Sequence, residues 1–392
     1  MPTSAPTLAF VESPVQLLNV LEWAYSGSAP GESVPLLDGV PSQPGRGTGV
    51  PPGPAGPGGT PAARMRIVVL PPTDPMSRGQ LRRMAALARD EGHEVRWQEA
   101  RGGRLAPLRA LAALAGDVRA ARTVVVGDPF SRYVQLLLTL VRAEQLVVVD
   151  DGTATMEFIA QTARGERLVR WHRVGGGGPA GRVRELAYAP VSATARRRFK
   201  AAKATGTKAA RRVEVFSSMP VTAHGAMTLR VNDFAWTRAR FGPPRLTKGT
   251  DLVGTSLVET GVVDPACYLD AVRTLTRVHG ATRYFAHRRE SPEKLRALSE
   301  ATGLEIVRPD LPLELIARRG PVGRTIVSFP STVVHTLPYA LTGTGVTVAV
   351  CDIDPDWLTG SASPRARGFL AGVTDTARDV RRLPAQAASA AG

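Results

Sequence analysis

Short runs of apolar residues alternate with amphipathic stretches along most of the chain. The first run, LAFVES (8–13), predicts a buried strand, and the stretch from Pro14 has helical periodicity, with proline at its first position and Ser13 as the cap. The runs TVVVGDP (123–129) and QLVVVDDG (145–152) are β-branched stretches typical of strands buried on both faces of a parallel sheet. This alternation predicts a doubly wound α/β domain.

The first half of the chain also contains segments that lack the pattern of a core. Between about 26 and 63 it is rich in glycine and proline without periodicity, which predicts a disordered insertion, and GGGGPAG (175–181) predicts a flexible linker. A basic, alanine-rich stretch, 193–212, has poor helical phase. The remaining predicted elements are strands at 65–71, 94–98 and 213–218 and helices at about 76–91 and 107–116.

A second alternating series begins near residue 251. It predicts strands at 251–259, 282–288, 304–307, 325–330 and 346–352, and helices at 265–278, 291–302, 311–318 and from Ser331. A long C-terminal helix at about 364–383 is expected to return to the first domain. We therefore expect an α/β fold of two Rossmann-like domains that face each other across a cleft, over residues 1–235 and 245–392, with the border left open between 215 and 250.

Composition narrows the class of protein. With 392 residues, 43% of them apolar, the chain is long enough for two packed domains. No run approaches the roughly 20 apolar residues that cross a bilayer, and the N-terminus lacks the pattern of a secretory signal, so we expect a cytoplasmic protein. Cys267 and Cys351 have the spacing of neither a disulfide framework nor a zinc site.

The formal net charge of +16 indicates attraction to a polyanion: nucleic acid, anionic lipid or an acidic substrate. Only five of the 50 basic residues are lysines, so 45 are arginines, a bias typical of a GC-rich genome that leaves open how much of the charge is functional. Arginine binds phosphate and carboxylate bidentately, which suits an enzyme of anionic sugars and nucleotides.

Two adjacent carboxylates, Asp150 and Asp151, follow a predicted buried strand, at the edge where open α/β sheets bind ligands. In one interpretation they form a plain turn, with Asp151 capping the next helix and Gly152 at positive φ. In the other, one carboxylate is a general base, because a dry site and a neighbouring negative charge raise its pKa and let it take the proton of a sugar hydroxyl. Spacing alone leaves both open.

Polar residues in the second half point to a phosphate. His287 ends a predicted strand and precedes Arg288, which suits bonding to, or protonating, a leaving phosphate. Ser331 and Thr332 open a helix, whose free N–H groups and dipole favour phosphate binding. Glu314, on the preceding short helix, has the chemistry to accept both ribose hydroxyls. Each also has an ordinary interpretation: a surface histidine, a helix cap and a helix-surface glutamate.

Weaker candidates follow the first strand of each domain. Gly254 and Thr255 would bring backbone close to a substrate, although they form neither a dinucleotide-binding nor a P-loop motif. Ser13 and Gln16 would line the acceptor side of a cleft, although polar residues at strand ends are more often caps. The segment GDPFSR (127–132) has the same status. No HExxH motif, nucleophile elbow or Walker loop is present in the sequence, so no other chemistry has equal support.

Taken in order, four motifs resemble those of bacterial sialyltransferases, including the capsule-type polysialyltransferases, which are GT-B glycosyltransferases. They are the acidic pair and glycine of DDGTATMEF, the histidine of FAHRRE, the glutamate of LPLELIA and the Ser-Thr of SFPSTVVHTL. Those families carry an acidic-acidic-Gly motif in the first domain and His-Pro and Ser-Ser/Thr motifs in the second. Here Arg288 stands in place of the proline.

The resemblance implies an inverting transfer of sialic acid, or a related nonulosonic acid, from a CMP-activated donor to a glycan hydroxyl in polysaccharide or surface-glycan synthesis. Asp150 would be the general base and His287 would stabilise the departing phosphate. Ser331 and Thr332 would hold that phosphate, and Glu314 would bind the ribose. No metal or other cofactor is expected, because protein donors stabilise the leaving group.

Other functions stay open at this point. One alternative is a GT-B enzyme that uses a UDP or GDP sugar, or an epimerase; another is a non-enzymatic polyanion binder. A specific nucleic-acid partner is not expected, because the sequence has no helix-turn-helix signature, zinc finger or RNP-type motif and only 5% aromatic residues. The basic stretch 193–212 is either a surface loop between the domains or a patch that holds the enzyme peripherally at the inner membrane face. The sequence does not specify the acceptor, the linkage or the oligomeric state.

Overall fold

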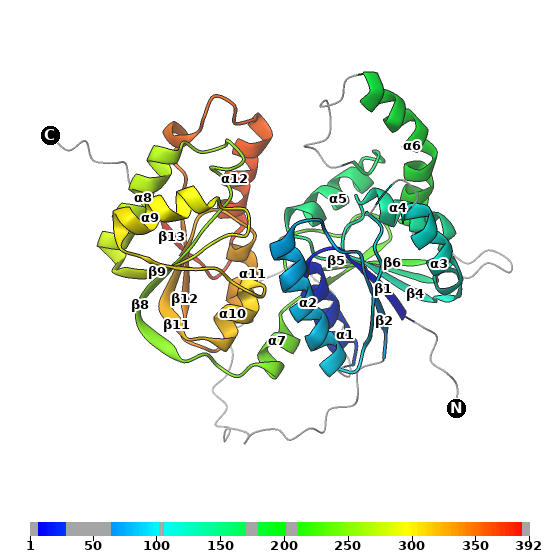
Figure 1. Cartoon of the computed structure of the whole chain (residues 1–392), viewed down its shortest axis with the longest axis horizontal. Helices are drawn as coiled ribbons and strands as arrows, with labels where there is room; N and C mark the ends of the chain where they lie inside the picture. The colour runs from blue at the N-terminus through cyan, green and yellow to red at the C-terminus, as the bar shows by residue number, and fades with distance from the viewer. Residues whose placement is uncertain are drawn as a thin grey trace.

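The computed structural model describes residues 7–28, 64–101, 103, 106–169, 179–200 and 211–385, which form two α/β domains (Figure 1). The first domain has seven parallel strands in the order β3-β2-β1-β4-β5-β6-β7. Their bounds are β1 Thr7–Val11, β2 Arg66–Val69, β3 Glu94–Trp97, β4 Thr123–Val126, β5 Gln145–Val149, β6 Arg212–Ser217 and β7 Met227–Val231.

Helices cover both faces of this sheet. Strands β1, β2, β4 and β5 send alternate side chains into two separate cores, which is why their apolar runs are continuous. One core contains residues of α3–α6 and the other residues of α1, α2 and α7. The helices are α1 Pro14–Ser28, α2 Pro75–Asp90, α3 Ala106–Ala120, α4 Arg132–Leu140, α5 Thr153–Ala163, α6 Pro179–Arg198 and α7 Ala235–Arg240.

The second domain repeats the strand order of the first on six strands, β10-β9-β8-β11-β12-β13, all parallel. The strands are β8 Leu246–Val253, β9 Ala281–Phe285, β10 Glu305–Val307, β11 Val322–Ser328, β12 Thr347–Cys351 and β13 Arg381–Leu383. The helices are α8 Pro265–His279, α9 Pro292–Thr302, α10 Leu313–Arg319, α11 Val333–Ala340 and α12 Pro364–Thr376, with a 3-10 turn at Pro355–Trp357. The predicted fold class of two Rossmann-like domains is confirmed.

The two domains pack on one another through α10 and α11. Leu311, Leu315 and Ala340 belong to the same buried cluster as α1 and α2 of the first domain. Polar contacts accompany this packing: Gln80 Nε2 donates to the carbonyl oxygen of Pro309 at 2.7 Å, and Arg318 Nε donates to that of Phe241 at 3.0 Å. This packing therefore fixes the position of the carboxyl ends of one sheet relative to those of the other.

The structure corrects the predicted C-terminus. Helix α12 ends at Thr376, and Arg381–Leu383 form β13 beside β12, where a helix was expected as far as residue 383. Asp379 has a φ of 57°, in the left-handed region, which an α-helix cannot continue through. The chain thus turns back and completes its own sheet instead of continuing to the first domain as one long helix.

Other differences concern weakly patterned segments. Strand β7 and helix α7 were not predicted, because β7 is an edge strand with mixed burial and α7 has only six residues. The last three residues of the expected linker 175–181 open α6 at Pro179, since proline is well suited to the first helical position. The predicted insertion at 26–63 lies outside the described residues from position 29 on, as do 175–178 and 201–210.

Candidate functional site

The sequence-predicted residues lie at the carboxyl ends of strands from both sheets. Asp150 follows β5, while His287 follows β9 and Ser331 follows β11. The loops after β5 and β11 meet at the domain boundary: a methyl group added at Gly152 would lie 2.6 Å from Cγ2 of Thr332. The acidic motif of the first domain therefore touches the hydroxyl motif of the second.

Asp150 is buried, with 2% of its surface exposed, and three donors surround its carboxylate. Thr155 Oγ1 donates to Oδ1 at 2.6 Å, whereas the backbone N–H and Oγ of Ser218 donate to Oδ2 at 3.1 and 3.0 Å. Burial raises the pKa of Asp150 above its ordinary value, and the donors only partly offset this. The result is a fixed carboxylate with an elevated affinity for a proton.

The residues after Asp150 form a turn, but not with the predicted cap. Gly152 has a φ of 66°, as expected, and is itself the N-cap of α5 without a side-chain hydrogen bond. Gly152 and not Asp151 therefore occupies the N-cap position, and the backbone N–H of Asp151 donates to Thr155 Oγ1 at 3.1 Å. Thr155 thus connects both acidic residues, and the side chain of Asp151 is half-buried.

Glu314 from α10 is also buried, with 5% exposed, and its Oε1 accepts from Thr336 Oγ1 of α11 at 2.6 Å. Burial raises the pKa of Glu314, and the negative charge of Asp150 raises it further. The two carboxylates therefore lie within electrostatic reach of each other across the domain boundary. Glu314 is thus a buried residue of the site and not the helix-surface glutamate of the ordinary interpretation.

His287 is held as a neutral imidazole. Its backbone N–H donates to Glu290 Oε2 at 2.6 Å, and its Nδ1 accepts from the backbone N–H of Arg289 at 3.2 Å. Burial lowers the pKa of His287 to about 4, with further lowering by Arg288 and Arg289. Because Nδ1 is an acceptor, the proton of the neutral ring is assigned to Nε2, which is left as a hydrogen-bond donor.

A buried polar network lies behind the His287 loop. Glu290 Oε1 accepts from Tyr284 Oη at 2.6 Å and pairs with Lys294 Nζ at 2.7 Å, and that ammonium also donates to the carbonyl oxygen of Thr255 at 3.0 Å. A methyl group at Gly254 would lie 2.1 Å from Glu290 Oε2. Gly254 and Thr255 therefore contact this network, where sequence analysis had expected contact with a substrate.

Ser331 and Thr332 precede α11 as predicted. Ser331 Oγ lies 3.2 Å from Ser328 Oγ, and Thr332 is the N-cap without a side-chain hydrogen bond, so the ordinary capping interpretation of Ser331 is not what the structure shows. The two hydroxyls sit at the positive end of an eight-residue helix, and Thr332 lies next to Gly152. This arrangement suits an anion at the domain boundary.

Arg288 of the same loop acts across the boundary as well. Its charge contributes to lowering the pKa of Asp74, the N-cap of α2, although hydrogen bonding from Ser77 is the largest cause. The arginine therefore lies within electrostatic reach of the first domain.

Ser13 and Gln16 are local supports. Ser13 Oγ accepts from the backbone N–H of Gln16 at 3.2 Å, which confirms the predicted cap of α1. The Gln16 side chain is buried, and its Oε1 accepts from the backbone N–H of Glu12 at 2.7 Å. It also fills the space beside Gly127, where an added methyl group would lie 2.4 Å from Oε1. Gln16 thus fixes the loops after β1 and β4.

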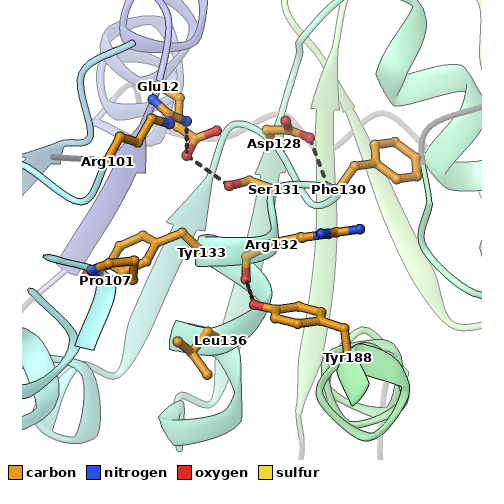
Figure 2. Close-up of a pocket in the computed structure, with 10 residues that line it drawn as sticks. All are labelled: Glu12, Arg101, Pro107, Asp128, Phe130, Ser131, Arg132, Tyr133, Leu136 and Tyr188. Atoms are coloured by element: carbon orange, nitrogen blue, oxygen red, sulfur yellow. Dashed lines mark hydrogen bonds and ion pairs between the residues drawn. The ribbon is translucent and has the colours of Figure 1, made fainter. Parts of the chain in front are cut away.

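A cavity of about 370 Å³ lies between the ends of β1 and β4 and helices α3, α4 and α6 (Figure 2). Sequence analysis named the segment 127–132, which lines it, as a weak candidate, but not Glu12, Arg101 or Tyr188. The signal was present: in sheets of this order, strands 1 and 4 flank the point where the strand order reverses, which is where ligands bind. Glu12 directly follows β1, and Asp128 lies two residues after the end of β4. The cavity is lined by Glu12, Arg101, Pro107, Asp128, Phe130, Ser131, Arg132, Tyr133, Leu136 and Tyr188.

The described residues contain neither a metal-binding cluster nor a membrane-spanning helix. No group of three or more His, Cys, Asp or Glu residues in this part of the chain is placed to hold a metal ion. None of the helices in the same residues combines the length and the apolar character needed to traverse a bilayer.

Comparison with known proteins gives similarity to solved structures alone. No protein-family model matches the chain, and neither does any curated protein sequence. An α/β-galactoside α-2,3-sialyltransferase from Photobacterium phosphoreum is 9% identical, over 97% of this chain and 99% of that one, with a TM-score of 0.48. MurG from Acinetobacter baumannii is 9% identical over 97% of this chain and 86% of that one, with a TM-score of 0.40. The heptosyltransferase WaaC from E. coli is 11% identical over 96% of this chain and 92% of that one, with a TM-score of 0.38. Similarity at this level leaves substrate and activity open.

Proposed function

We propose that the protein is an inverting glycosyltransferase that moves sialic acid, or a related nonulosonic acid, from a CMP-activated donor to a glycan hydroxyl. The observation that carries this proposal is the contact between Gly152 and Thr332 across the domain boundary. It brings a buried carboxylate with a raised pKa next to a helix N-terminus with two hydroxyls. A proton acceptor beside an anion site is what glycosyl transfer from a nucleotide sugar requires.

On the acceptor side, Asp150 would take the proton of the attacking hydroxyl. The hydroxyl oxygen would form the new bond to the anomeric carbon while the bond from that carbon to the phosphate oxygen breaks, and the electron pair would leave with CMP. Thr155 Oγ1 donates to Oδ1 of Asp150 at 2.6 Å and thereby fixes the carboxylate that would take the proton. Because the carboxylate is buried, the acceptor must enter the space between the domains to reach it.

On the donor side, the second domain would hold the departing phosphate. Ser331, Thr332 and the N-terminus of α11 would bind its oxygens, and His287 would donate from Nε2 as a neutral group. With a pKa of about 4, His287 would act as a hydrogen-bond donor and not as a proton donor at neutral pH. Glu314 would accept from the ribose hydroxyls.

One observation favours a second candidate, transfer or epimerisation of a UDP or GDP sugar. His287 is followed by Arg288 and Arg289, where the sialyltransferase families have His-Pro. Two arginines beside the phosphate site supply more positive charge than a monophosphate leaving group needs, and they would suit a diphosphate.

Calorimetric titration of the purified protein with CMP, UMP and GMP would test the assignment. We expect selective binding of CMP, weakened at least about tenfold in the Ser331→Ala/Thr332→Ala variant, because charge-assisted hydrogen bonds are lost. Thr342→Ala is a matched control, since it removes an exposed hydroxyl just beyond the other end of α11. Preference for UMP or GMP would support the second candidate, and equal or absent binding of all three would contradict the nucleotide site.

Peripheral membrane contact through 193–212 belongs to the same proposal. In the described part of this stretch, Arg196 and Arg198 donate to backbone carbonyl oxygens of Gly165 and Thr139. Arg197 and Lys200 are exposed and would face anionic lipid, each contributing about 1 kcal/mol. Sedimentation with anionic vesicles should weaken when both become glutamine; unchanged binding would remove this role.

A further inference from the structure

The cavity between β1 and β4 is not used by the proposed chemistry, yet it has the composition of a binding site. Its volume of about 370 Å³ is within the range of about 300–1,000 Å³ typical of small-molecule pockets. Carboxylates, guanidinium groups and aromatic rings converge on it from the loops after β1 and β4 and from α4 and α6 (Figure 2). This combination is common where sugars bind, since rings cover apolar faces and charged groups bond to hydroxyls and acids.

Glu12 lines this cavity, and one of its two carboxylate oxygens already has partners. Oε1 accepts from Ser131 Oγ at 2.8 Å and pairs with Arg101 Nη2 at 2.8 Å. Within the described residues, Oε2 has no hydrogen-bond or ion-pair partner. The side chain is only 10% exposed, so a carboxylate oxygen with free lone pairs is held in a nearly dry place. Such an oxygen is suited to accept from a ligand hydroxyl.

Arg132 provides a positive charge at the same cavity. Its guanidinium lies over the ring of Tyr188, 5.5 Å from the centroid, and the Tyr188 hydroxyl donates to the Arg132 carbonyl oxygen. Among the described residues, no carboxylate lies within ion-pair distance of Arg132. The guanidinium is therefore oriented by stacking alone, with its N–H donors available for a bidentate contact with an acid group.

Tyr133 adds an unsatisfied polar group to the wall of the cavity. Its hydroxyl is buried, and it has no hydrogen-bond partner in the part of the chain that the structure describes. Buried hydroxyls are rarely left in this state, because losing the hydrogen bonds of water costs free energy. A bound ligand would supply the missing partner.

The cavity also connects electrostatically to the proposed reaction site. The negative charge of Asp151 contributes to raising the pKa of Glu12, together with that of Asp128, although burial is the largest cause. Asp151 directly precedes Gly152, which contacts Thr332. A ligand in the cavity would thus lie on the acceptor side of the domain boundary, next to the acidic motif.

We propose that this cavity is the subsite for the acceptor glycan and that it selects a sugar residue bearing a carboxylate. Glu12 Oε2 accepts from a hydroxyl of that residue, Arg132 binds its carboxylate, and Tyr188 covers an apolar face. This inference rests on the proposed glycosyl transfer, because it treats the ligand as the acceptor of that reaction.

Saturation-transfer NMR with the full chain would test the subsite without turnover, using galacturonic acid and galactose as probes that differ at one carboxylate. We expect the acid to bind and galactose to bind more weakly. Arg132→Gln should weaken binding of galacturonic acid about tenfold or more and leave binding of galactose unchanged. Glu12→Gln should weaken binding of both sugars, because both lose a hydrogen bond to a charged group. Arg109→Gln, an exposed arginine on α3 that does not line the cavity, is the matched control.

The outcomes are separable from those of the nucleotide titration. Equal affinity for both probes, absence of binding, or wild-type binding by the Arg132 and Glu12 variants would overturn the subsite, whatever nucleotide is bound. If the protein binds galacturonic acid and Arg132→Gln weakens that binding, the acceptor subsite is supported, even if CMP selectivity fails. The proposed nucleotide site is judged by the titration alone.

Discussion

The two domains share one strand order and carry opposite chemistry at their carboxyl ends. The first presents acids, Glu12, Asp128, Asp150 and Asp151, whereas the second presents His287, Arg288 and the hydroxyls before α11. Burial acts on both edges in the same direction, toward the neutral form: it raises the pKa of Asp150 and lowers that of His287. Asp150 of the first domain thereby accepts a proton more readily. His287 of the second domain stays neutral, so it donates a hydrogen bond but does not act as an acid. The same scaffold can divide acceptor and donor tasks through the residues that follow its strands.

The largest expected effect comes from removing the acid at the boundary. Asp150→Asn should lower kcat about 10²–10⁴-fold with CMP affinity unchanged, because a general base contributes this much to proton transfer. Asp151→Asn is the matched variant, since it makes the same change in the adjacent acid, which is half-buried where Asp150 is buried. Steady-state kinetics with a CMP-activated donor, and Tm as a control for folding, would decide. A larger loss in Asp151→Asn would move the base to the neighbouring residue.

A smaller effect is expected from the contact between Gly152 and Thr332 across the domain boundary, and Gly165 provides the control. Gly152 and Gly165 both have a φ of 66°, but a methyl group at Gly165 would meet nothing within 4 Å, whereas at Gly152 it would lie 2.6 Å from Thr332. Alanine at Gly165 should cost about 1–2 kcal/mol of folding free energy for the positive φ. Alanine at Gly152 should cost more, because its ψ of −128° lies outside the left-handed α region and its methyl group would meet Thr332. Only Gly152→Ala should also weaken CMP binding, by displacing the start of α11.

Denaturant unfolding and calorimetry on both glycine variants would measure these two effects. Equal CMP affinity in Gly152→Ala and Gly165→Ala would contradict a functional contact between Gly152 and Thr332.

The smallest expected effect is on stability as a function of pH, and Glu12 of the first domain and His287 of the second contribute with opposite signs. The pKa of Glu12 is raised to about 7 from 4.5, so the folded protein binds more protons between these values, and the stabilisation from Glu12 is lost as pH rises through 7. The pKa of His287 is lowered to about 4 from 6.5, so its contribution is present above 6.5 and is lost as pH falls through 4.

Thermal unfolding between pH 4 and 8 would separate these contributions. Glu12→Gln should remove part of the decline toward pH 8, and His287→Gln part of the decline toward pH 4, each by a few degrees in Tm. A wild-type profile in either variant would show that the corresponding residue titrates normally in the folded protein.

The interior of both sheets could be predicted from the sequence, and its edges could not. Continuous runs such as those of β4 and β5 are specific to strands covered on both faces, so their positions were correct to within a few residues. Edge strands lack this signal: β7 has mixed burial, and β13 is the arginine-rich segment RRL, which was expected in a helix. Its strand state depends on pairing with β12, a contact between distant parts of the chain.

The sequence by itself determined the two-domain α/β class and which chemical groups stand at strand ends, because local periodicity specifies strands and helices and the residues after them are then given. Only the tertiary structure decided what those groups do. It brought Glu314 within electrostatic reach of Asp150, placed Gly254 against Glu290, and assembled a cavity from Glu12, Arg132 and Tyr188. Burial, electrostatic neighbours and cavities arise from contacts between residues far apart in the chain, and a single sequence carries no local record of them.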